Sequence, residues 1–127
     1  ALCAFDSDPP DYDLAQTALR VAVGLDPAVG MYPANLCVVL FSAGARADAW
    51  AMYVQATSVK GFVLPEHYWP VVALSALAVR TDAGPVNDEV LAGIFRKALS
   101  VGPKSCPWVD AAEFERAAAG IPGLRDQ

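Results

Sequence analysis

Two segments of helix length are almost entirely apolar, and they constrain the fold of this chain more than any other feature. Residues 34–43 are apolar on nearly every side of a helix, and residues 71–79 hold Ser75 as their one polar side chain. A helix that is hydrophobic all round lies in the middle of a core or crosses a membrane. Both segments are shorter than the roughly 20 residues that a membrane span needs. They therefore predict two central helices with other helices packed around them.

The rest of the chain shows the spacing of amphipathic helices. Apolar residues recur at three- and four-residue intervals in residues 13–25, 46–60, 87–99 and 110–120. Asn87 and Asp110 are suited to cap helix starts, and Gly61 and Gly120 are suited to follow helix ends. The expected buried face of the first of these helices comprises Leu14, Ala15, Ala18, Leu19, Val21, Ala22 and Leu25, and that of the second comprises Trp50, Tyr53, Val54 and Thr57.

The fold class follows from these patterns. No run of four or more residues alternates strictly enough to require a strand, and 127 residues correspond to about one domain. We predict an all-α fold, a compact bundle of five or six helices with two central buried helices. Residues 1–12 would form an acidic, proline-containing arm, residues 13–121 the helical domain, and residues 122–127 a C-terminal tail.

Composition and charge exclude several classes of protein. Hydrophobic residues make up 55% of the chain and charged residues 18%, the opposite of a disordered chain. Of the fourteen acidic residues, four lie between Asp6 and Asp13, and the other ten stand against nine basic residues. Without a basic face, nucleic acid is not an expected partner. No basic-then-apolar leader or membrane anchor is visible, so we expect a soluble protein, cytoplasmic rather than secreted.

The cysteines and the single histidine give no metal or cofactor motif. Cys37 lies within an apolar run, where a thiol behaves as a small hydrophobe. Cys3 and Cys106 lie near opposite ends; they either pair or stay reduced, and an odd count of three favours free thiols. His67 has no ligand pair at the close spacing of a zinc site. We expect no metal ion and no cofactor.

One catalytic arrangement is open as an alternative. Cys37 followed by His67 is the chain order of some thiol hydrolases, in which a histidine deprotonates the nucleophile. Against it, Cys37 lies inside an apolar helix, and no glycine-rich oxyanion segment precedes it. No phosphate-binding glycine pattern is present either. We therefore assign no catalytic residue.

The most distinctive group of side chains is aromatic. Phe62, His67, Tyr68 and Trp69 surround a connection that is stiffened by proline residues at 65 and 70. Large amphipathic aromatics on a rigid segment are typical of binding hot spots. The alternative is that these rings cover the core where the chain turns, and Trp108 in a later connection allows the same two interpretations.

These patterns favour a non-enzymatic helical module for protein–protein interaction or self-assembly. Its expected partner-binding residues are Phe62, His67, Tyr68 and Trp69. The alternative function is a small-ligand-binding or regulatory helical domain, because helical bundles can hold an apolar ligand between their helices.

Overall fold

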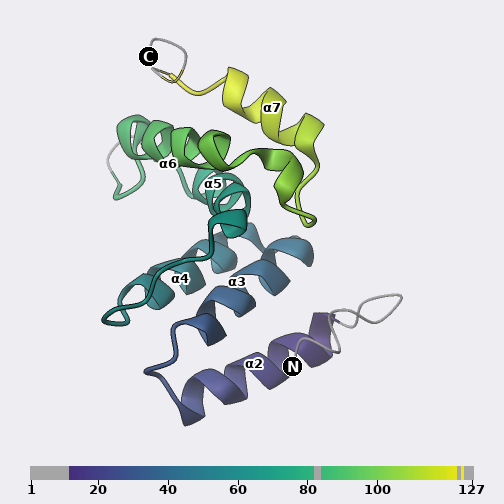
Figure 1. Cartoon of the computed structure of the whole chain (residues 1–127), viewed down its shortest axis with the longest axis vertical. Helices are drawn as coiled ribbons and strands as arrows, with labels where there is room; N and C mark the ends of the chain where they lie inside the picture. The colour runs from purple at the N-terminus through teal and green to yellow at the C-terminus, as the bar shows by residue number, and fades with distance from the viewer. Residues whose placement is uncertain (1–11, 82–83, 123, 125–127) are drawn as a thin grey trace. The chain divides into compact units, whose positions relative to one another are not determined.

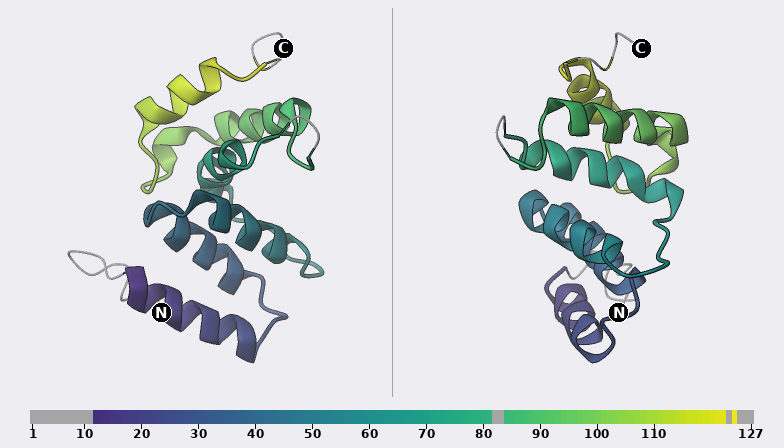
Figure 2. Two further views of the ribbon diagram at one scale, coloured as in Figure 1. Left: turned by 180° about the vertical axis from the view of Figure 1, so that it is seen from behind. Right: turned by 90° about the vertical axis from the view of Figure 1, so that its left-hand side faces the viewer.

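The computed structural model describes residues 12–81, 84–122 and 124 (Figure 1, Figure 2). Over these residues the chain is all-helical and contains no strand, which confirms the predicted fold class. The α-helices are α2 (Tyr12–Leu25), α3 (Met31–Ser42), α4 (Arg46–Thr57), α5 (Trp69–Ala78), α6 (Asp88–Val101) and α7 (Ala111–Ala119), with two short 3₁₀ helices, η1 (Glu66–Tyr68) and η2 (Pro103–Ser105).

The predicted arm and tail lie almost wholly outside the described residues. Tyr12, the last residue of the arm, begins α2. Of the tail, the structure describes Pro122 and Leu124. The helices between them form two compact units, residues 1–64 with α2 to α4 and residues 65–127 with η1 and α5 to α7.

In the first unit α3 is the central helix, and it packs against both α2 and α4. Its buried residues are Pro33, Ala34, Leu36, Cys37, Val38, Val39, Leu40 and Phe41. The predicted all-round burial of this segment is thereby confirmed. Gly44 ends the helix with φ of +91°, a conformation that glycine adopts without strain. After the turn, the guanidinium of Arg46 lies 4.7 Å from the centre of the Phe41 ring.

The predicted buried faces of α2 and α4 are partly wrong. On α2, Ala15 and Leu19 are buried, whereas Leu14, Val21 and Leu25 are exposed. On α4 the buried residues are Ala49 and Ala56; Trp50 and Tyr53 are half-buried, and Val54 and Thr57 are exposed. The reason is that a helix buries the stripe that meets its neighbour, and on α4 two alanines form this stripe because they allow close approach.

In the second unit α5 is the buried helix, and it packs against α6 and α7. Of the predicted central segment 71–79, Val71 to Ala76 are buried, whereas Leu77 and Val79 are half-buried and Ala78 is exposed. The rings of Phe95 on α6 and Phe114 on α7 stack with centroids 5.1 Å apart. The predicted caps are present. The side chain of Asn87 accepts a hydrogen bond from the Val90 N–H at 3.0 Å, and Asp110 accepts one from the Ala112 N–H at 2.9 Å.

Ser75 is the one polar interruption of α5, and its removal is expected to stabilise the protein. The side chain is fully buried, and its Oγ has no hydrogen-bond partner among the described residues. A buried hydroxyl without a partner is unfavourable, and alanine is the better helix former, so Ser75→Ala should raise the free energy of unfolding by about 1 kcal/mol. Urea denaturation measures the change. Ser100→Ala, at an exposed position of α6, is the control. Destabilisation by Ser75→Ala would contradict the expectation.

Candidate functional site

The four predicted partner-binding residues are divided between the two units, one in the first and three in the second. Phe62 lies in the first unit, where its ring covers Gly30 so closely that a Cβ atom added to Gly30 would lie 2.5 Å from the ring. A side chain at position 30 would therefore require the Phe62 ring to move. His67 and Tyr68 lie on η1 in the second unit, and Trp69 is the first residue of α5.

In the second unit, Trp108 joins His67 and Tyr68, and we call these three residues the aromatic cluster. The Tyr68 and Trp108 rings meet edge to face with centroids 5.2 Å apart, and the His67 and Trp108 rings are 5.7 Å apart. His67 and Tyr68 also meet edge to face, at 4.8 Å. Tyr68 is 8% exposed, so its ring covers the core, whereas His67 is exposed and Trp108 half-buried.

Trp69 lies at the start of helix α5. Its backbone is already helical, with φ −59° and ψ −37°, although it precedes Pro70. Proline disfavours this conformation in the residue before it, but proline is well suited to the first turn of a helix, where its missing N–H leaves no bond unmade. The Trp69 side chain is half-buried. The segment that the sequence indicated as a connection is therefore the entry into α5.

The two cysteines that the structure describes, Cys37 and Cys106, are buried thiols. Burial raises the pKa of Cys37, in α3 of the first unit, to about 12. Burial also raises the pKa of Cys106, against opposing hydrogen bonds with the backbone at Trp108, Val109 and Val71. A protonated, inaccessible thiol is not a nucleophile, so Cys37 gives the thiol-hydrolase alternative no support. The question of a Cys3–Cys106 bond lies outside the described residues because Cys3 does.

Sequence reasoning missed an apolar surface on α2. Leu14, Val21 and Leu25 are 55%, 55% and 81% exposed, and with the half-buried Ala18 they form one line on the helix, which we call the α2 stripe. The spacing of these residues is four, three and four, the repeat by which helices pair along a seam. Ala15 and Leu19 belong to a second stripe that is buried. The sequence did indicate this surface, because the seven apolar positions of α2 are too many to lie on one face of the helix.

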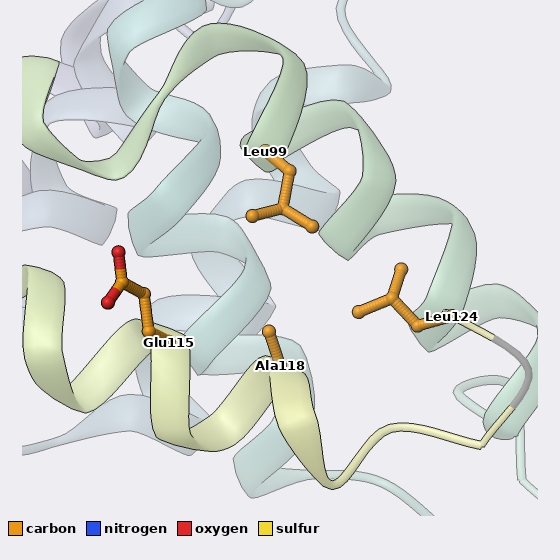
Figure 3. A pocket seen from close by; sticks show the side chains of 4 residues that line it. All are labelled: Leu99, Glu115, Ala118 and Leu124. Carbon is orange, nitrogen blue, oxygen red and sulfur yellow. The ribbon is translucent and has the colours of Figure 1, made fainter. Parts of the chain in front are cut away.

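A pocket opens on the second unit between α6, α7 and the C-terminal segment (Figure 3). Its volume is about 320 Å³, and it is lined by Leu99, Glu115, Ala118 and Leu124. Figure 3 shows the three apolar side chains facing a common hollow and the Glu115 carboxylate beside them. Glu115 is exposed, so the pocket combines an apolar lining with a carboxylate at its rim. In the part of the chain that the structure describes, no three metal-ligating side chains come together.

Trp69→Ala tests the predicted partner-binding role. We expect this substitution to weaken partner binding or self-association by about 2 kcal/mol while leaving stability nearly intact, the behaviour of a hot spot. Tyr68→Ala is the contrast: its ring is buried, so the substitution should lower stability by about 3 kcal/mol. Urea denaturation and sedimentation of each variant supply both numbers. Lost stability with unchanged association per folded molecule would contradict the role of Trp69.

No helix among the described residues combines the length and the apolar character that crossing a bilayer requires. Comparison of the chain with protein-family models, with curated proteins and with solved structures finds no match.

Proposed function

We propose that the chain is a non-enzymatic helical module for protein–protein interaction that associates with copies of itself. The observation that carries this proposal is the α2 stripe, in which three large aliphatic side chains are more than half exposed. Contiguous apolar surface on a folded domain commonly marks an interaction site, whereas singly scattered apolar residues do not.

Magnitudes indicate how strong such an association would be. Burying a large aliphatic side chain completely is worth about 1.5–3 kcal/mol, and the stripe offers three that are partly covered already. The loss of translational and rotational freedom opposes binding by at least about 4 kcal/mol. The stripe alone therefore supports weak association. Tighter binding requires that a second surface contributes.

The aromatic residues are the proposed second surface. His67 is exposed and lies against the half-buried Trp108, and Trp69 is half-buried at the start of α5. These side chains offer large aromatic area that is not fully buried, as interface anchors do. Phe62 and Tyr68 would act through packing, since the Phe62 ring covers Gly30 and Tyr68 is buried.

Sedimentation velocity over a concentration series tests self-association through α2. We expect Leu25→Glu to weaken self-association about tenfold or more, because it places a charge in the apolar contact, and to leave the unfolding free energy nearly unchanged. Val63→Glu is the matched control, because Val63 is 83% exposed and lies outside the stripe. A Kd of 1 mM corresponds to a binding free energy of about −4 kcal/mol. If the wild-type chain stays monomeric up to about 1 mM, the proposal of self-association is wrong.

Binding of a small ligand is the second candidate function, and the pocket favours it. Its volume of about 320 Å³ falls at the lower end of the range for ligand sites. An apolar amine would match the lining and the Glu115 carboxylate. Chemical-shift changes at Leu99 and Ala118 on addition of a short alkylamine would support this function, and their absence at millimolar concentration would remove it.

A further inference from the structure

We draw no further inference here: the strongest candidate, the exposed apolar patch that the α2 stripe forms on α2, already carries the proposed self-association, and nothing in the structure shows what covers it.

Discussion

Replacing Phe95 with alanine is expected to lower the free energy of unfolding by about 3–5 kcal/mol. Phe95 and Phe114 are fully buried, and their rings stack at 5.1 Å with 25° between their planes. This pair joins α6 to α7, and its loss would leave a cavity that the surrounding helices only partly fill. Urea denaturation followed by circular dichroism measures the change.

Leu99→Ala is the control for this prediction, because Leu99 also lies on α6 but is 43% exposed; it should lower stability by less than about 1 kcal/mol. The double variant of Phe95 and Phe114 should show a coupling of about 0.5–1.5 kcal/mol, as for other aromatic pairs in contact. Equal effects of Phe95→Ala and Leu99→Ala would contradict the buried position of the Phe95 ring.

The helices that could be predicted from the sequence are those whose own residues contain a cap or an apolar pattern that determines the structure locally. Asn87 and Asp110 start helices because a short side-chain oxygen satisfies a backbone N–H of the first turn, and neither bond depends on distant residues. The segments around Val39 and Val72 could be placed in the core because each is apolar all round, so no choice of face was required.

The face that an amphipathic helix buries could not be predicted where apolar residues lie on several sides. On α2 the sequence allows either the line of Ala15 and Leu19 or that of Leu14 and Leu25 to turn inward, and contact with α3 decides between them. On α4 the large residues Trp50 and Val54 suggested the buried side, yet the close approach of α3 selects Ala49 and Ala56.

The candidate site was predicted in part for the same reason. The aromatic residues at 67–69 are neighbours in the sequence, so their grouping was visible. That Tyr68 turns inward and that Trp108 joins the cluster depends on the packing of η1 against the rest of the second unit, a contact about forty residues away along the chain. The pocket likewise arises only when α6, α7 and Leu124 come together.

Leu40→Ala is expected to lower the free energy of unfolding by about 2–5 kcal/mol, while Leu25→Ala in the same unit should change it by less than about 0.5 kcal/mol. The two substitutions remove the same atoms from helices. They differ in that Leu40, on the central α3, is 2% exposed and Leu25, at the end of α2, is 81% exposed. Chemical denaturation of both variants in one buffer gives the comparison.

The same two substitutions distinguish an effect on folding from an effect on association. Leu40→Ala should reduce association only through the loss of folded molecules, whereas Leu25→Ala should weaken it with stability intact, because its side chain belongs to the α2 stripe. A small effect of Leu40→Ala on stability would mean that α3 is not the centre of its unit. A large effect of Leu25→Ala on stability would mean that the stripe serves folding, and the assignment of α2 to association would then be wrong.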